Sequence, residues 1–262
     1  MDQNAFVSKE AIPVAVKIIN HSGQTLSLGK EVDWLAFTVE TTEGFVLSPT
    51  DKVPVVGEFD LATSKYALKR VDLAPYFEIT KTGEYMIIAT VKIKDWEAEV
   101  SSAPKKFQIT RGTKLWEGAF GMPMSASNAG PPVVRKYILQ QSSNMKQMKL
   151  YVRVTDEMEN HVFKVVPVGP LLSFSRPEPR MDQQNNLHLI YQSGARRYLY
   201  SVVTPDGAII QRQTFDVTGT RPHLHVDGTG KISVVDGQRH IMEDDINRPD
   251  EQVISNGAPS RN

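Results

Sequence analysis

Hydrophobic and polar residues alternate in short runs through the first 112 residues. Residues 12–19 alternate as a half-buried strand does, and residues 34–39 are aromatic and β-branched. Residues typical of turns separate these runs, as in Glu43-Gly44 and Lys81-Thr82-Gly83. About seven short strands over roughly 110 residues predict a β-sandwich. The remaining runs lie at residues 65–68, 83–93 and 106–109.

Residues 73–89 join two of the predicted strands through a glycine turn that is followed by a tyrosine. Gly83 forms the turn, and Tyr85 lies two residues later. This passage resembles the strand E to strand F corner of immunoglobulin-like and fibronectin-type domains, in which a tyrosine hydroxyl bonds back to the backbone. The resemblance covers residues 1–112 and is to Cys-free bacterial relatives, because the antibody disulfide is absent. It implies an immunoglobulin-like β-sandwich in which Tyr85 is a structural corner residue.

The second half of the chain contains a repeat with an offset of 45 residues. Arg176-Pro177 recurs as Arg221-Pro222, and Asp182 recurs as Asp227 ahead of a second strand-like run. Proline before a strand lacks a ladder donor, and an aspartate closes a turn onto backbone amides. We therefore expect a structural role for Asp182 and Asp227. A period near 45 residues with four strands per copy resembles the blades of β-propellers.

A degenerate earlier copy within residues 136–175 brings the total to about two and a half copies. Closed propellers need at least about four blades, so this chain cannot close a ring alone. An open pair of blades, a sandwich or barrel of the same strands, and a ring across subunits all fit the sequence. A compact β-domain derived from blades is the expected form. The predicted fold class is all-β, with an N-terminal immunoglobulin-like sandwich and a C-terminal antiparallel β-domain of blade-like repeats.

The composition changes near the middle of the chain. Eleven of the 13 basic residues in residues 1–112 are lysine, whereas 11 of the 17 in residues 113–262 are arginine. Three glycines and three prolines fall within residues 118–132. A loop-like stretch at a change of composition predicts a domain boundary. We expect the sandwich at residues 1–112, a linker at 113–132, the repeat domain at 133–242, and a flexible polar tail at 243–262, with a docking segment as the alternative for the tail.

The chain has 262 residues, no cysteine and a formal net charge of zero. The lack of cysteine excludes disulfides, thiolate nucleophiles, Cys-ligated zinc and iron–sulfur clusters. Neutrality provides no electrostatic reason to expect nucleic acid or an anionic membrane surface as a partner. No apolar run approaches the roughly 20 residues that span a bilayer. We expect an extracytoplasmic bacterial protein, periplasmic, cell-surface or secreted, although the sequence begins without the pattern of a signal peptide.

Arginines in the second half are the candidate binding residues. Arginine recognises carboxylates and phosphates through bidentate hydrogen bonds and is enriched at interfaces. The recurrence of Arg176 and Arg221 at one offset favours a structural role, in which they tie the edges of successive repeats together, over contact with an anionic ligand or partner. The candidates are Arg176, Arg180, Arg196, Arg197 and Arg221.

His223 and His225 are two residues apart, so both would project from one face of a strand. This spacing suits zinc or copper, with His188 or His240 as third ligands. No third ligand is evident from the spacing, and two histidines on a half-exposed strand face are the simpler interpretation. The sequence motifs of nucleophile elbows, phosphate-binding loops and zinc proteases are absent. We predict no cofactor, no metal site and no enzymatic activity.

Together, these features predict a binding or assembly protein that associates with a protein partner or with itself. Strand edges at residues 83–93, or at the unclosed repeat, would allow self-association by strand pairing. The alternative is a carbohydrate-binding or carbohydrate-active protein that uses the Arg- and His-rich second half. Nucleic acid is not an expected partner.

Overall fold

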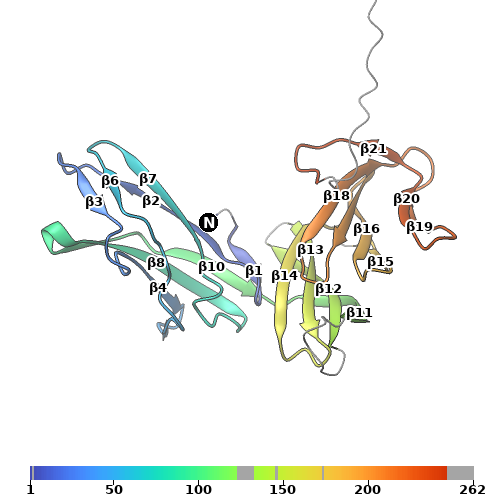
Figure 1. The fold of residues 1–262 in the computed structure, drawn as a ribbon, viewed down its shortest axis with the longest axis horizontal. Coiled ribbons are helices and arrows are strands. Elements are labelled where there is room, and N and C mark those ends of the chain that lie inside the picture. The colour runs from blue at the N-terminus through green and yellow to red at the C-terminus, as the bar shows by residue number, and fades with distance from the viewer. Residues whose placement is uncertain (2, 123–132, 145–146, 173, 247–262) are drawn as a thin grey trace, which may run out of the picture. The chain divides into compact units, whose positions relative to one another are not determined.

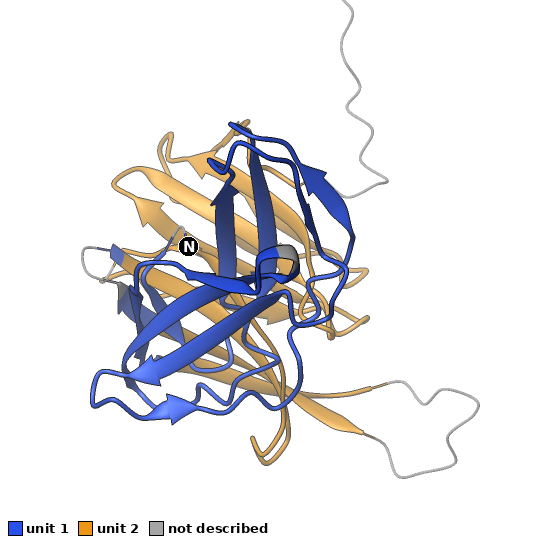
Figure 2. Ribbon diagram, turned by 90° about the vertical axis from the view of Figure 1, so that its left-hand side faces the viewer, with its two compact units in different colours: residues 1–113, 142–147 blue, residues 114–141, 148–262 orange. Residues whose placement is uncertain are grey.

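The computed structural model describes residues 1, 3–122, 133–144, 147–172 and 174–246. Its regular structure is almost entirely strand, and the described residues contain one helical element, a 3-10 turn at Lys94–Trp96. The predicted all-β class is confirmed (Figure 1). The chain divides into two compact units (Figure 2). The first unit comprises residues 1–113 and 142–147, and the second comprises residues 114–141 and 148–262.

A six-stranded sheet forms the larger part of the first unit. In order across the sheet its strands are β1 (Ala5–Val7), β10 (Lys105–Thr110), β8 (Gly83–Ile93), β4 (Leu35–Thr41) and β5 (Val46–Leu47), and β9 (Ala98–Ser101) also pairs with β8. The pairing of β1 with β10 is parallel, and the other pairings are antiparallel.

Strand β8 is paired along both of its edges. Thr90, for example, lies opposite Ala36 of β4 on one side and Ser101 of β9 on the other. The prediction that residues 83–93 form an exposed strand edge is therefore wrong. A run of alternating residues predicts a strand, but its neighbours in the sheet come from distant parts of the chain. The alternation itself is present, since every second residue from Tyr85 to Ile93 is buried.

Two shorter antiparallel pairs complete the first unit. They are β2 (Pro13–Ile19) with β7 (Tyr66–Asp72), and β3 (Leu26–Leu28) with β6 (Phe59–Leu61). Apolar side chains from these strands and from the large sheet form one core. Trp34 is almost fully buried in this core and donates its indole N–H to the carbonyl of Val55 at 2.7 Å. That bond satisfies the one polar atom that the indole carries into the core.

Three further sheets, in the residues that the structure describes, lie in the second unit except at Thr113, at residues 142–144 and at Gln147, which belong to the first. The first is ordered β11 (Thr113–Gly121), β12 (Val134–Asn144), β13 (Gln147–Asp156) and β14 (Val162–Pro170). The second is ordered β15 (Glu178–Met181), β16 (Leu187–Gly194), β17 (Arg197–Val203), β18 (Ile209–Asp216) and β21 (Gln238–His240). The third is the antiparallel pair β19 (His223–Val226) and β20 (Ile232–Val235).

Part of the predicted linker is a strand. Residues 113–121 form β11, which pairs with β12, whereas residues 123–132 lie outside the described residues. Gly118, which suggested a loop, lies beside the indole ring of Trp116: a Cβ atom at this position would be 2.5 Å from that ring. The glycine therefore accommodates close packing within a strand, a role that glycine also has in sheets.

Strand β16 is buried on both of its faces. Leu187 and Leu189 belong to a core shared with β13 and β12, whereas Ile190 belongs to a second core shared with β19 and β20. Its sequence consequently reads as a continuous apolar run around one buried histidine, His188, and does not alternate.

Asp182 and Asp227 hold two turns of the same geometry, 45 residues apart. In each turn the aspartate carboxylate accepts hydrogen bonds from the backbone N–H groups two and four residues later, at 2.8–2.9 Å for Asp182 and 2.9–3.0 Å for Asp227. The residue three positions after the aspartate has a left-handed φ in both turns, 62° at Asn185 and 84° at Gly230. Asn and Gly are the residues that adopt this conformation most readily.

The start of the predicted flexible tail is packed against the second sheet. Arg212 of β18 and Ile246 exchange two backbone hydrogen bonds, at 2.8 and 3.0 Å. The Asp245 carboxylate accepts hydrogen bonds from the guanidinium of Arg239 at 2.8 Å and from the N–H of Met242 at 2.9 Å. The prediction of a flexible tail is therefore wrong for residues 243–246, and residues 247–262 lie outside the described residues. Within the described part of the chain, no helix has the length and apolarity needed to cross a membrane.

Candidate functional site

Arg176 and Arg221 line one cavity of about 380 Å³ in the second unit. Arg176 precedes β15 and Arg221 precedes β19, so the two arginines occupy equivalent places in the repeat. Both side chains are exposed. The other residues that line this cavity are Phe174, Ser175, Glu178, Ile190, Gln192, Tyr198 and Pro222. We call it the Arg176–Arg221 cavity.

Packing of the third sheet against the second brings the two arginines together. Leu224 of β19 is buried with Ile190 of β16 in one core, so the start of β19 lies beside the start of β15. The N–H of Leu224 also donates a long hydrogen bond of 3.5 Å to the carboxylate of Glu178. Two Arg-Pro segments that are far apart in the sequence consequently border the same space.

The walls of the cavity combine apolar and polar groups. Ile190 is 2% exposed and Tyr198 is 9% exposed, so both present only a small surface to the cavity. Phe174 is 78% exposed. Gln192 is held by its amide, which donates to the backbone carbonyls of Gly194 and Ala195 at 3.1 Å each. Three exposed residues, Phe174, Arg176 and Arg221, therefore border the same cavity.

The charge of the cavity is positive. Its charged lining residues are two arginines and one glutamate. Neither guanidinium of Arg176 or Arg221 forms an ion pair with another described residue. A guanidinium presents several N–H donors in a plane that matches the two oxygens of a carboxylate or the oxygens of a phosphate. The cavity is thus suited to a ligand that carries one anionic group beside an apolar or ring-shaped part.

The other three candidate arginines do not reach this cavity. Arg180 is exposed on β15. Arg196 donates to the carbonyl of Val217 at 2.9 Å, and Arg197 lies 3.5 Å from the carboxylate of Asp216. Arg196 and Arg197 line a separate cavity of about 450 Å³ beside the turn between β16 and β17. The five candidates therefore divide into one converging pair and three residues elsewhere.

The carboxylate of Asp216 lies between the ring of His240 and the guanidinium of Arg197. His240 Nδ1 is 2.8 Å from its Oδ2, and the Arg197 guanidinium lies near Oδ1. The hydrogen bond with His240 is the main reason why the pKa of Asp216 is lowered, with a smaller contribution from Arg197. Because Arg197 already forms an ion pair with Asp216, Arg196 and Arg197 are less available to an anionic ligand than Arg176 and Arg221 are.

The two candidate metal-binding histidines lie on β19, with the buried Leu224 between them. The Nδ1 atom of His223 is 3.4 Å from the carboxylate of Asp236. Both ring nitrogens of His188 have partners, Tyr200 and Asp182, and His240 Nδ1 lies 2.8 Å from the carboxylate of Asp216. Across the described residues, no group of three His, Asp or Glu side chains could hold a metal ion.

The sequence did not predict a series of buried hydrogen bonds that joins Tyr200, His188 and Asp182 in the second unit. His188 is 3% exposed, its Nδ1 lies 2.7 Å from the hydroxyl of Tyr200, and its Nε2 lies 3.1 Å from the carboxylate of Asp182. Burial alone would raise the pKa of Asp182, but hydrogen bonds from Asn186 and His188 outweigh burial and lower it. The one feature of the sequence that could have indicated these hydrogen bonds is a histidine, His188, inside an apolar run.

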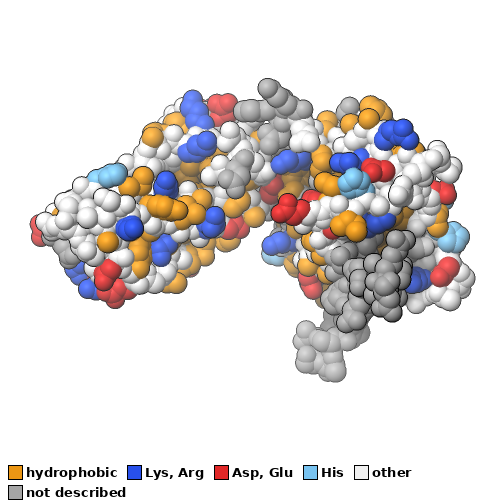
Figure 3. Space-filling model, turned by 90° about the horizontal axis from the view of Figure 1, so that it is seen from above, with side chains coloured by type: hydrophobic (Ala, Val, Ile, Leu, Met, Phe, Trp, Pro, Cys, Tyr) orange, Lys and Arg blue, Asp and Glu red, His pale blue; other side chains and the backbone are white. Residues whose placement is uncertain are grey.

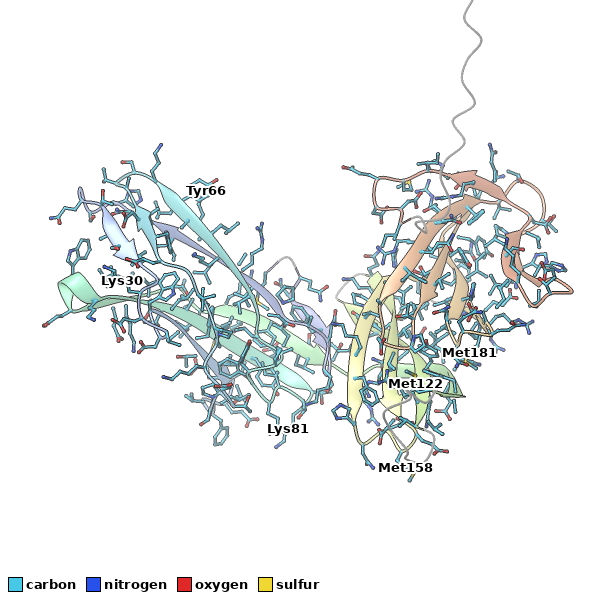
Figure 4. All side chains as sticks on the ribbon, viewed as in Figure 1. Lys30, Tyr66, Lys81, Met122, Met158 and Met181 are labelled. Carbon is cyan, nitrogen blue, oxygen red and sulfur yellow. The ribbon has the colours of Figure 1, made fainter. Side chains whose placement is uncertain are left out.

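The Tyr85 hydroxyl forms the hydrogen bond to the upstream backbone that its sequence context predicted. The hydroxyl donates to the backbone carbonyl of Lys81 at 2.8 Å, four residues upstream (Figure 4 labels Lys81). The Tyr85 ring stacks on Phe107, with the ring centres 5.5 Å apart. Burial raises the pKa of the Tyr85 hydroxyl, which therefore remains protonated and able to donate.

No protein-family model, no curated protein and no solved structure matches this chain.

Proposed function

We propose that the chain is a non-enzymatic binding protein whose second unit recognises an anionic group of a protein partner through Arg176 and Arg221. The observation that carries this proposal is that two exposed arginines line one cavity and form no ion pair with another described residue. An Arg pair of this kind binds a carboxylate strongly because both groups are charged and their planes match.

Comparison with other arginines argues against a purely structural role for this pair. Arg135, Arg196, Arg212 and Arg239 each donate to a backbone carbonyl of another segment, as an arginine that ties segments together must do. No such hydrogen bond joins Arg176 or Arg221 to another described residue. Arg176 and Arg221 therefore lack the hydrogen bonds, to described residues of another segment, that arginines holding successive repeats together would form.

The proposal includes an architecture for each unit. The parallel pairing of β1 with β10 and the hydrogen bond from Tyr85 to Lys81 support an immunoglobulin-like sandwich in the first unit. The shared turn of Asp182 and Asp227, together with two successive sheets whose four consecutive strands are neighbours, supports blade-like repeats in the second. An extracytoplasmic location remains part of the proposal.

Binding of acidic peptides tests this function. The full chain is measured against an array of peptides that carry Asp, Glu or a terminal carboxylate next to an aromatic residue. We expect Arg176→Ala and Arg221→Ala each to weaken binding about tenfold or more, since a hydrogen bond to a charged group is worth ~1.5–3 kcal/mol. Arg180→Ala is the matched control, because Arg180 is exposed on the same segment but does not line the cavity. Equal losses in all three variants, or no binding by any peptide, would contradict the proposal.

An acidic carbohydrate is the second candidate ligand. The observation in its favour is Phe174, an aromatic ring that is 78% exposed in the lining of the Arg176–Arg221 cavity. A ring of this kind can stack on a sugar while the arginines hold its carboxylate. A glycan array that includes uronic and sialic acids separates the two ligands. Specific glycan binding that Phe174→Ala and Arg221→Ala both abolish would favour the carbohydrate.

A further inference from the structure

An apolar groove opens at one edge of the first unit. Two adjoining cavities, of about 240 and 350 Å³, share the lining residues Val16, Lys17, Ala89 and Ser102. The space is lined by β2, by Leu26 and Leu28 of β3, by Met1, and by β8 with β9 and the residues after it. We call it the β2–β9 groove.

Side chains that point toward the core are exposed in this groove. Val100 of β9 pairs with Val91 of β8, so both side chains lie on one face of the sheet. Val91 is 8% exposed, whereas Val100 is 57% exposed. On the other side, Val14 of β2 is buried, but Val16 and Ile18 on the same face are partly exposed. The apolar interior between the two layers is thus open to solvent along this edge.

The backbone at this edge is also unpaired. Within the described residues β2 pairs only with β7, and β9 pairs only with β8. Each strand therefore has a second edge whose N–H and C=O groups have no sheet partner. Such edges accept an added strand, whose alternate side chains then enter apolar pockets.

The charge of the groove is positive. Lys17 and Lys105 carry the only charged side chains among its lining residues, and neither forms an ion pair with another described residue. The Lys17 ammonium lies 4.8 Å from the ring centre of Tyr66, a residue of β7 labelled in Figure 4. By contrast, Lys92 and Lys94 of the same unit pair with Asp33 and Glu31. Lysine and arginine side chains lie among apolar ones on this unit's surface when it is seen from above (Figure 3).

We propose that the β2–β9 groove receives an extended segment of a protein partner, which adds a strand to the open edge of the first unit. Alternate apolar side chains of that segment cover Val16, Ile18 and Val100. Acidic residues at its ends face Lys105 and, on the outer rim of the groove beside Tyr66, Lys17. Apolar pockets, unpaired strand edges and lysines without carboxylate partners are three independent features that together fit this occupant. The interaction is separate from the Arg176–Arg221 cavity and does not depend on the function proposed for it.

A peptide array with a matched pair of variants tests the proposal. The probes are peptides of about ten residues that alternate Val, Ile or Leu with Thr and carry Glu at both ends. We expect members of this array to bind the full chain, and Val100→Asp to weaken that binding at least about tenfold. Val46→Asp is the control, because Val46 is a strand valine with a similar exposure of 63% that lies outside the groove. Replacement of the terminal Glu residues by Lys is expected to weaken binding as well.

Several results would overturn this proposal. They are no binding by any peptide of the array, unchanged binding to Val100→Asp, and equal loss in Val100→Asp and Val46→Asp. Thermal unfolding checks that the variants are folded, and Val100→Thr, which keeps the β-branched shape, replaces Val100→Asp if the charged variant unfolds. Sedimentation tests a different occupant: if the wild-type chain dimerises without peptide and Val100→Asp does not, the groove binds a second copy of this chain instead of a partner.

Discussion

The Nε2 atom of His188 lies 3.1 Å from the carboxylate of Asp182, and both side chains are largely buried. The same carboxylate accepts the backbone hydrogen bonds that close the turn before β16. Asp182 therefore links a local turn to a buried histidine and, through that histidine, to Tyr200 of the next strand. Asp227 closes an equivalent turn without a buried histidine, so the effect of replacing Asp182 can be compared with that of replacing Asp227 in the same protein.

Replacement of Asp182 by alanine is expected to destabilise the second unit by about 2–4 kcal/mol, because it removes the turn and leaves a buried histidine without its carboxylate partner. The measurement is urea unfolding, with the change in midpoint converted to free energy. Asp227→Ala removes a turn of the same geometry at an exposed site and is expected to cost clearly less. If the two variants were equally stable, the contact between Asp182 and His188 would have no stabilising role.

The pKa shift of Asp182 predicts how stability changes with acid. Its folded pKa lies below the ordinary value of 3.8, so in acid the unfolded chain takes up the proton first. The contribution of Asp182 is fully present above its unfolded pKa and is lost as the pH falls through the lower folded pKa. Urea midpoints measured from neutral pH down to strongly acidic pH should decline less steeply for Asp182→Asn than for the wild type. A parallel decline in both proteins would show that Asp182 is not one of the titrating groups.

Removal of the Tyr85 hydroxyl is expected to destabilise the first unit by about 1–2 kcal/mol. Tyr85→Phe keeps the ring that stacks on Phe107 but deletes the hydrogen bond to the carbonyl of Lys81. Tyr66→Phe is the control, since Tyr66 is 64% exposed on β7 and its loss of a hydroxyl should leave the stability unchanged. Thermal unfolding of the two variants provides the comparison, and an effect of equal size in both would argue against a corner role for Tyr85.

A side chain at Gly230 is expected to lower the free energy of unfolding, whereas a side chain at nearby Gly228 is not. Gly230 has a φ of 84°, and a Cβ atom there would lie 2.8 Å from the side chain of Gln183. We expect Gly230→Ala to cost about 1–2 kcal/mol, because alanine adopts this backbone conformation poorly. Gly228 lies in the same turn region with a negative φ, and a Cβ atom there would meet no other atom within 4 Å, so Gly228→Ala should be neutral or slightly stabilising. Chemical denaturation distinguishes these outcomes.

The local pattern of the chain predicted its strands and turns well. Alternation identified β2 and β8, and the resemblance around Tyr85 anticipated a hydroxyl bond to the backbone upstream. The 45-residue offset anticipated that Asp182 and Asp227 close similar turns. β11 was missed because Gly118 suggested a loop, whereas the glycine makes room for Trp116 within a strand.

The same pattern could not predict which segments lie together. His188 is a buried partner of Asp182 because β16 is covered by other strands on both of its faces. Arg176 and Arg221 were recognised as equivalent, but their shared cavity depends on how β19 packs beside β15 and β16. The β2–β9 groove likewise depends on which strands remain at the edges of their sheets.

The sequence by itself determined the all-β class, the alternating strands and the repeated aspartate turns of this protein. These features depend on hydrogen bonds and side-chain periodicity within a few consecutive residues, so they can be read from a short stretch of chain. Only the tertiary structure decided that β8 is internal, that Arg176 and Arg221 share a cavity, and that Val100 faces an open groove. Each of these depends on the packing of residues that are distant in the chain, and no local pattern specifies that packing.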